Sequence, residues 1–271
     1  MSSKCRYIGL AVSAAMLVCS VARADIRDTI QNAKSGTTVQ CSGSYTVSKI
    51  VVPSGVTVKG PATFNFNSTS SDGFYIKSST TGVVLQSLTI KNAYHGIRID
   101  GSNNKVTSCT ISGNHNTGIH ISGSYGQGKN NTISGCTATG NADNVGNADG
   151  FGIKDGAGSG NSYANCTAYN NSDDGWDFYG ANGTVSVSGC QAYSNGYNSN
   201  GNGDGFKMGG TYNYAHTYTS CTAHNETGTT GRGFDTNHNT AQIKITSCHS
   251  YSNKSKDVLG NSIVSNSTMQ Q

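Results

Sequence analysis

A cysteine repeat is the feature of this sequence that most restricts its fold. A Cys-x-Ala motif, or a close variant of it, recurs at spacings of 27, 30, 24, 31 and 27 residues. The motif begins at Cys109, Cys136, Cys166, Cys190, Cys221 and Cys248. An asparagine stands five residues after each of these cysteines, except once, where Glu226 takes the position. Internal repeats of this length are typical of solenoid proteins.

A second motif follows the asparagine in each repeat: a glycine, then two apolar residues on either side of one variable residue. Gly96-Ile-Arg-Ile, Gly150-Phe-Gly-Ile and Gly205-Phe-Lys-Met are examples. Each repeat therefore holds three short alternating runs separated by Ser, Gly and Asn turns. Three strands in each coil of 21 to 31 residues predict an all-β, right-handed parallel β-helix of about nine coils. Residues 25–271 should form one domain, because no linker interrupts the repeat.

The two ends of this domain carry different signals. Within residues 25–36, Ile26, Ile30 and Ala33 have the spacing of a short amphipathic helix. We expect this helix to cap the N-terminal end, since an uncapped end would expose strand edges. Residues 258–271 are polar, and we expect them to form a poorly ordered tail.

Residues 1–24 have the composition of a signal peptide. Lys4 and Arg6 precede an apolar run over residues 10–21, and Ala22-Arg23-Ala24 matches a cleavage site. No later stretch approaches the roughly 20 apolar residues of a membrane span. The formal charge of +4 falls to +1 without this segment, which disfavours nucleic acid as a partner. We expect a secreted or periplasmic monomer with no membrane or nucleic-acid partner.

The repeated residues themselves have structural interpretations. Alternation along a strand points each motif cysteine and the residue two beyond it into the core. Cysteines in register should stay buried thiols, because their Cβ atoms lie about 4.8 Å apart, beyond the roughly 3.5 to 4.5 Å of a disulfide. The asparagines should form a hydrogen-bonded ladder. Trp176 falls on an inward position and is predicted to lie in the core.

Candidate functional residues appear where the repeat lengthens. The turn between the asparagine and the second motif is four residues in most coils, but nine at 141–150 and ten at 195–205. These two loops flank the short turn that carries Asp173 and Asp174, so a cleft is expected there. Six of the 14 acidic residues lie between Asp143 and Asp177.

The repeat register brings these charges together on successive coils. Asp149, Asp174 and Asp204 each precede the glycine of the second motif, and Asp177, Lys207 and Asp235 share its variable, outward position. Carboxylates this close repel one another unless a cation relieves them. A set of oxygen ligands alone favours Ca²⁺. One alternative is that calcium only staples the coils and Lys207 only neutralises aspartates.

This arrangement suits β-elimination on a uronic acid polymer. The proton to be removed lies α to a carboxylate, and calcium bound to that carboxylate would stabilise the carbanion. Lys207 is the candidate base. A lysine base works only when neutral, so activity should rise toward alkaline pH.

Three segments resemble polysaccharide lyase family 9. They are Asn147-Ala-Asp149-Gly-Phe151, Asn171-Ser-Asp173-Asp174-Gly-Trp-Asp177 and Gly203-Asp-Gly-Phe-Lys207-Met-Gly-Gly210. The resemblance extends from Asn141 to Asn239 and implies a calcium-dependent pectate lyase that cleaves polygalacturonate into 4,5-unsaturated oligogalacturonides. It also implies Asp149, Asp173, Asp174 and Asp177 as calcium ligands and Lys207 as the residue that abstracts the proton.

Four further residues complete the predicted site. Asp204 stands where the family pattern would place an asparagine, and we expect Asp204 and Asp235 to lie just outside the ligand set. Arg232 and Lys154 are candidates for binding substrate carboxylates.

Other functions stay open at this stage. A rhamnogalacturonan lyase, or a lyase of another uronate polymer, would use the same site. A non-catalytic, calcium-stapled adhesin or sugar-binding protein would share the fold and survive loss of Lys207. A hydrolase of the polygalacturonase kind is disfavoured, because only the Asp-Asp of its motif series is present.

Overall fold

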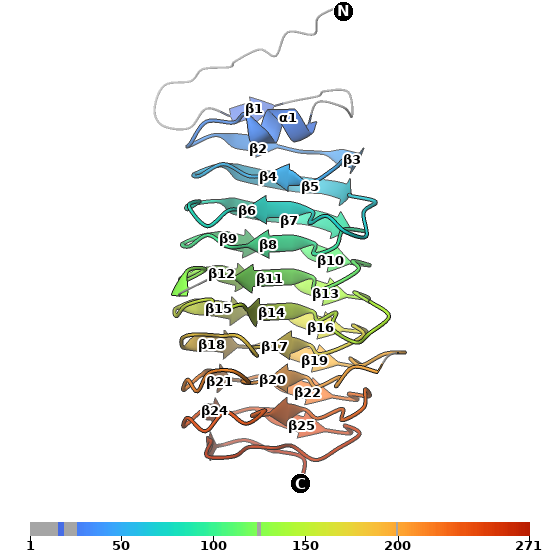
Figure 1. Ribbon diagram of the computed structural model, residues 1–271, viewed down its shortest axis with the longest axis vertical. Coiled ribbons are helices and arrows are strands. Elements are labelled where there is room, and N and C mark those ends of the chain that lie inside the picture. The colour runs from blue at the N-terminus through green and yellow to red at the C-terminus, as the bar shows by residue number, and fades with distance from the viewer. Residues whose placement is uncertain (1–15, 19–25, 124–125, 199) are drawn as a thin grey trace, which may run out of the picture.

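The computed structural model describes residues 16–18, 26–123, 126–198 and 200–271. Figure 1 shows a column of stacked coils in which the chain runs from the N-terminal end at the top to the C-terminal end at the bottom. Strand β1 (Met16–Val18) pairs in parallel with β2 (Thr38–Gln40) at the N-terminal end. The rest of the expected signal peptide lies outside the described residues, and its function as an export signal stays a prediction.

The coils contribute strands to three faces. Each strand pairs in parallel with the equivalent strand of the neighbouring coil. The first face contains β2, β5 (Thr57–Asn65), β7 (Val84–Lys91), β9 (Lys105–Thr107), β12 (Thr132–Ser134), β15 (Asn161–Ala164), β18 (Val185–Ser188), β21 (Thr217–Thr219), β24 (Lys244–Thr246) and β26 (Ile263–Ser265). The second face contains β3 (Gly43–Thr46), the later halves of β5 and β7, β10 (Thr110–Ser112), β13 (Thr137–Thr139), β16 (Thr167–Tyr169), β19 (Gln191–Tyr193), β22 (Thr222–His224) and β25 (His249–Tyr251).

The third face is a separate sheet, and it carries the candidate site. It contains β4 (Ile50–Val51), β6 (Phe74–Ile76), β8 (Ile97–Ile99), β11 (Ile119–Ser122), β14 (Phe151–Lys154), β17 (Trp176–Asp177), β20 (Phe206–Lys207) and β23 (Phe234–Asp235). From β6 onward, these strands correspond to the second repeat motif of the sequence. The right-handed parallel β-helix predicted from the repeat is confirmed.

The core is built from the inward residues of both motifs. The six repeat cysteines are free thiols and at most 1% exposed, so the expectation of unpaired thiols in the six repeats is confirmed. Trp176 is fully buried and stacks between Phe151 and Phe206, with ring centroids 4.8 and 4.7 Å away. Its predicted place in the core is therefore also confirmed.

The asparagine ladder runs beside this core. The Nδ2 of Asn141 donates to Oδ1 of Asn171 at 2.9 Å, and Asn171 donates in the same way to Asn195 at 2.9 Å. Glu226 takes the next position, where its carboxylate accepts from the backbone and side-chain nitrogens of Asn195. The ladder fixes the start of every turn that leads to the third face.

Replacing Asn171 by alanine should lower the free energy of unfolding by about 2 to 4 kcal/mol, because the Asn141 amide nitrogens would lose a buried acceptor. A fall in the thermal midpoint followed by circular dichroism would measure the effect. Asn261→Ala is the matched control, because Asn261 is exposed and its side chain makes one hydrogen bond, to Thr240. Equal midpoints for the two variants would contradict a structural ladder.

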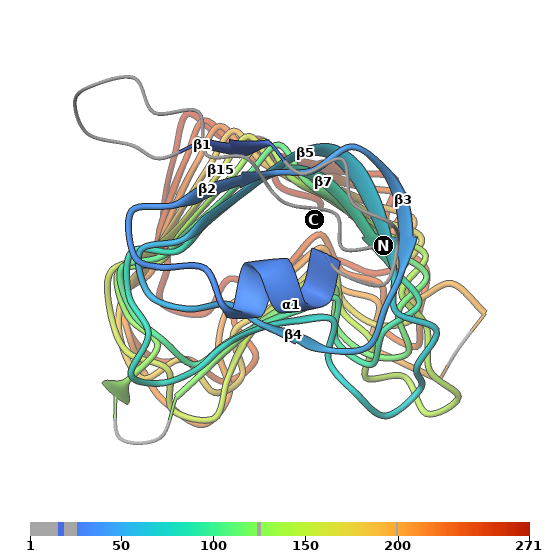
Figure 2. The ribbon, with the colours of Figure 1, turned by 90° about the horizontal axis from the view of Figure 1, so that it is seen from above.

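Helix α1 (Ile26–Gln31) lies across the N-terminal end of the column (Figure 2). Ile26 and Ile30 are buried, and Ala33 packs partly buried against the core. The expected short helix is thus present, and its apolar side covers the opening of the first coil.

The expectation of a poorly ordered tail was wrong. Strand β26 pairs with β24, and Thr268 forms a parallel bridge with His249. The Gln270 side chain accepts from the Asn253 amide at 2.7 Å and donates to its carbonyl at 2.8 Å. The polar composition misled the prediction, because these side chains supply the hydrogen bonds that the last coil would otherwise leave open.

Candidate active site on the third face

Asp173 and Asp174 occupy the short turn between the ladder residue Asn171 and strand β17. The Asp173 Oδ1 atom accepts hydrogen bonds from the backbone nitrogens of Asn202 at 2.7 Å and Gly203 at 3.4 Å. The long loop at 195–205 therefore closes onto this turn from the following coil. Asp173 keeps only 5% of its surface exposed.

The predicted stack of Asp149, Asp174 and Asp204 is present, and all three residues are fully buried. The Oδ1 atom of Asp149 accepts from the backbone nitrogen of Asp174 at 3.2 Å, and Asp174 Oδ1 accepts from that of Asp204 at 2.7 Å. One oxygen of each carboxylate is thus tied to the next coil.

Asp149, Asp173 and Asp174 meet in a cluster. Each offers a carboxylate oxygen that lies within 4.8 Å of the other two. The Oδ2 atom of Asp174 is buried and has no hydrogen-bond donor, and its charge partner is Lys207. Several buried oxygens, one of them without a donor, suit a hard cation such as Ca²⁺. Three of the four predicted ligands are therefore brought together.

The fourth predicted ligand, Asp177, lies at the edge of this cluster. Its Oδ1 accepts from the backbone nitrogen of Tyr179 at 2.7 Å, while its Oδ2 forms a close ion pair with Lys154 and lies 3.6 Å from the Nζ of Lys207. Both oxygens are thus engaged by groups of the protein.

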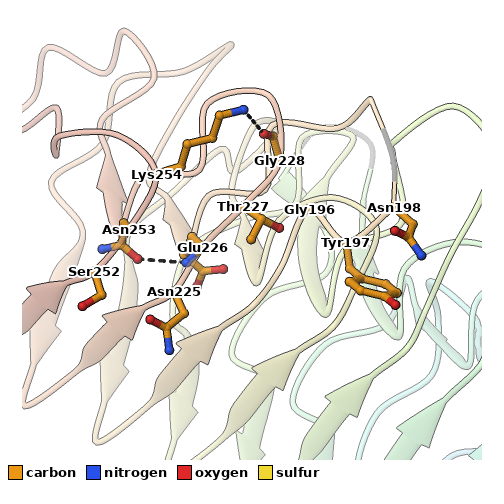
Figure 3. Close-up of a pocket in the computed structure, with 10 residues that line it drawn as sticks. All are labelled: Gly196, Tyr197, Asn198, Asn225, Glu226, Thr227, Gly228, Ser252, Asn253 and Lys254. Carbon is orange, nitrogen blue, oxygen red and sulfur yellow. Dashed lines mark hydrogen bonds between the residues drawn. The ribbon is translucent and has the colours of Figure 1, made fainter.

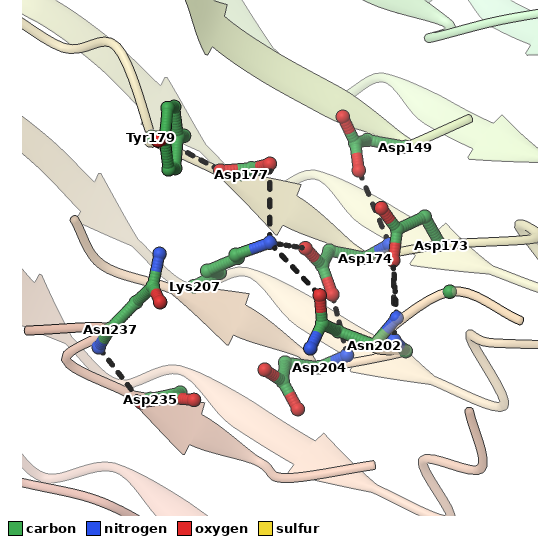
Figure 4. Close-up of polar contacts among 12 residues, drawn as sticks. Asp149, Asp173, Asp174, Asp177, Tyr179, Asn202, Asp204, Lys207, Asp235 and Asn237 are labelled. Atoms are coloured by element: carbon green, nitrogen blue, oxygen red, sulfur yellow. Dashed lines mark hydrogen bonds and ion pairs between the residues drawn. The ribbon is translucent and has the colours of Figure 1, made fainter. Parts of the chain in front are cut away.

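Lys207 lies between the predicted ligands and the next coil (Figure 4). Strand register pairs Asp177 directly with Lys207, and Lys207 with Asp235, as the repeat predicted. The Lys207 Nζ atom is 3.1 Å from Asp174 Oδ2 and donates to Asn202 Oδ1 at 3.2 Å. Lys207 is only 9% exposed, so neighbouring residues cover most of its side chain although its position in the repeat is outward.

The charges of the site act on one another. Burial and the neighbouring Asp173 raise the pKa of Asp174 well above its usual value. Burial and the charge of Asp149 raise the pKa of Asp173 to about 7. Burial alone would lower the pKa of Lys207, but the surrounding carboxylates, Asp174 first, outweigh it and hold this pKa above its usual value. Lys207 is therefore the counter-ion of an acidic cluster.

The four additional predicted residues lie around this centre. Lys154 contacts Asp149 Oδ2 at 3.2 Å as well as Asp177, so it belongs to the acidic cluster itself. Arg232 binds Asp235 at 2.6 Å, and its backbone nitrogen donates to Asp204 at 2.8 Å. The roles of Lys154 and Arg232 in binding substrate stay predictions.

Three residues of the site escaped the sequence prediction. Asn202 holds Lys207, the Thr117 hydroxyl donates to Asp149 Oδ2 at 3.2 Å, and Tyr179 donates its backbone nitrogen to Asp177. Asn202 lies inside the longest loop, where the repeat gives no register. An aromatic residue two positions after Asp177 was the one signal available for Tyr179.

A hollow lies at the base of the 195–205 loop, away from the aspartate cluster (Figure 3). Its lining residues are Gly196, Tyr197, Asn198, Asn225, Glu226, Thr227, Gly228, Ser252, Asn253 and Lys254. None of them belongs to the acidic cluster or to the Asp177–Lys207–Asp235 row. The catalytic and metal-binding residues predicted from the sequence therefore lie on the third face and not in this hollow.

The stacked coils define a right-handed parallel β-helix protein with a buried aspartate and lysine site on one face. Residues 18–266 match the model of the Pel9A-like right-handed β-helix region, so the chain belongs to this family. The structure resembles the crystal structure of pectate lyase Pel9A with a TM-score of 0.75 and 26% identity, over 89% of this chain and 72% of that one. A solved rhamnogalacturonan lyase shares the fold, with a TM-score of 0.64 and 23% identity over 80% and 67% of the two chains.

Curated relatives with similar sequences carry the name pectate lyase L. The protein of Dickeya chrysanthemi is 31% identical over 167 residues, which cover 59% of this chain and 39% of the relative. That of Paenibacillus polymyxa is 34% identical over 147 residues, 47% of this chain and 33% of the relative. The matched segment thus spans between a third and two fifths of these relatives. Within the described residues, no helix has the length and apolarity needed to cross a membrane.

Proposed function

We propose that this protein is a secreted, calcium-dependent pectate lyase that cleaves polygalacturonate by β-elimination, with Lys207 as the base. The observation that carries the proposal is the position of the Lys207 Nζ atom, 3.1 Å from Asp174 and directly paired in register with Asp177. Membership of the Pel9A-like family and the pectate lyase names of the relatives support it.

Asp149, Asp173 and Asp174 would hold the calcium ion, and Asp177 would join them by exchanging its lysine contacts for the ion. Bound there, calcium would also bind the substrate carboxylate and withdraw the charge that develops on the α carbon. The cluster fits this role because three buried carboxyl groups each offer an oxygen within 4.8 Å of the others, and a bound cation would favour their ionised form.

Lys207 would remove the proton of the carbon next to the substrate carboxylate. The electron pair of that C–H bond becomes the C4–C5 double bond, and the C4–O4 bond breaks with its electrons staying on the leaving oxygen. The proton remains on Nζ until solvent takes it, and the leaving oxygen takes a proton from solvent. Asn202, which accepts from Nζ at 3.2 Å, would hold the amine in place for the reaction.

The rate should rise toward alkaline pH. The aspartates raise the pKa of Lys207, and only the neutral amine can accept a proton, so its active fraction grows as pH increases. A profile of kcat/KM against pH, measured with saturating calcium, checks this direction. A rate that peaks in acid would contradict a lysine base.

The direct test is the ultraviolet absorbance of unsaturated uronate released from polygalacturonate by the purified protein. We expect calcium-dependent product formation. Parallel reactions with rhamnogalacturonan and with methyl-esterified pectin define the substrate. Rhamnogalacturonan offers the site the same uronate carboxylate, whereas the methyl ester lacks the carboxylate that calcium would bind. Binding without cleavage of any polymer would instead indicate the non-catalytic, calcium-stapled protein.

A further inference from the structure

Tyr179 is an exposed aromatic residue beside the reactive row formed by Asp177, Lys207 and Asp235. It follows strand β17 and is 52% exposed, whereas Asp177, two residues earlier, is 2% exposed. Its backbone nitrogen donates to Asp177 Oδ1 at 2.7 Å. In Figure 4, Tyr179 and Asp149 lie on opposite sides of Asp177. The aromatic face that Tyr179 exposes beside these charged residues is therefore available to a ligand.

The Tyr179 ring packs against Gly210 of the following coil. A Cβ atom on Gly210 would come within 2.3 Å of the ring Cδ2 and 2.8 Å of Cγ, so the ring lies directly over this glycine. The φ of Gly210 lies outside the left-handed region, so its backbone conformation does not require glycine. Thr211 also donates its backbone nitrogen to the Tyr179 carbonyl at 2.8 Å. The ring is thus held before any ligand arrives, which lowers the entropy cost of binding.

We propose that Tyr179 is the platform on which a uronate ring of the substrate stacks beside the bond that is cleaved. This inference rests on the proposed lyase function. The aspartates and Lys207 engage the carboxylate and the reacting C–H bond, and they leave the apolar C–H face of the pyranose without a partner. Tyr179 offers an exposed aromatic surface on the coil next to Lys207, where such a face would lie.

Three variants test separately the contributions of the Tyr179 ring, its hydroxyl group and its contact with Gly210. Tyr179→Ala should raise KM about tenfold and leave kcat within about twofold, because stacking binds the ground state and the transition state alike. Tyr179→Phe should keep wild-type kinetics. Gly210→Ala should raise KM by an intermediate factor, since its new methyl group displaces the ring. Tyr251→Ala is the matched control, because Tyr251 is 50% exposed and lies at the end of β25 on the second face.

Affinity for saturated trigalacturonate, measured by calorimetry with calcium in the Lys207→Ala background, tests the platform apart from catalysis. Tyr179→Ala should weaken this binding by the same factor. If the wild-type protein binds the trimer but does not cleave polygalacturonate, the lyase function is refuted, but the proposed role of Tyr179 in binding is not. Unchanged affinity in Tyr179→Ala, or no trimer binding at all, overturns the platform. Loss of kcat in Tyr179→Phe also overturns it, because the hydroxyl would then be the acid that protonates the leaving oxygen.

Discussion

Lys207→Ala should reduce kcat on polygalacturonate by about 10²- to 10⁴-fold, the contribution typical of a general base. The Lys207 amine lies 3.1 Å from Asp174 and 3.6 Å from Asp177. The other lysine amine at the cluster, that of Lys154, is engaged in ion pairs with Asp149 and Asp177. The measurement is the initial rate of unsaturated product formation at alkaline pH with saturating calcium.

Lys207→Arg distinguishes a base from a counter-ion. Arginine keeps the positive charge beside Asp174 and Asp177, but it stays protonated at every working pH. We therefore expect Lys207→Arg to lose activity as Lys207→Ala does. Lys254→Ala should remain active, because Lys254 is exposed and its amine bonds only a backbone carbonyl, that of Gly228. If the Lys207→Arg variant is active, Lys207 is not the base and serves only as a positive charge that neutralises the aspartates.

Removing calcium should abolish cleavage, and adding Ca²⁺ back should restore it. Mg²⁺ should restore it poorly, because the smaller ion demands near-octahedral geometry and keeps its waters. Calcium should also raise the thermal midpoint of the protein, by the equivalent of about 2.7 kcal/mol at a hundredfold excess over Kd. This second readout needs no substrate, so it tests the site separately from the reaction.

Asp173→Asn should raise the calcium concentration for half-maximal activity at least tenfold, since it removes one charge from the three-aspartate cluster. Asp28→Asn is the control, because Asp28 lies on the distant capping helix and its side chain is exposed. Cleavage that persists in chelator would refute the calcium role. Thermal stabilisation by calcium without cleavage would indicate a non-catalytic protein in which calcium only links neighbouring coils.

Much of the site followed from periodicity. The side-chain alternation of a strand has a period of two, so one register places every member of the second motif on a known side. The positions of Asp177, Lys207 and Asp235 on successive coils could be predicted for this reason, and the pairing of β17, β20 and β23 confirms them. The stack of Asp149, Asp174 and Asp204 followed in the same way.

The parts that were missed lie where the repeat ends. Asn202 reaches Lys207 from inside an irregular loop, and a loop has no period from which a neighbour can be inferred. Lys154 bends back to Asp149 and Asp177, which depends on side-chain torsions that a one-dimensional pattern does not contain. The contacts of Gln270 were hidden by a polar composition that suits both a free tail and a hydrogen-bonded edge.

The coil, its three faces and the alignment of Asp177, Lys207 and Asp235 could be predicted because they depend on spacing that is repeated along the chain. The depth at which Lys207 is buried, the aspartate oxygens that meet and the contact of Tyr179 with Gly210 became known only from the folded structure. These features arise from packing between segments that differ from coil to coil, so no single repeat carries them.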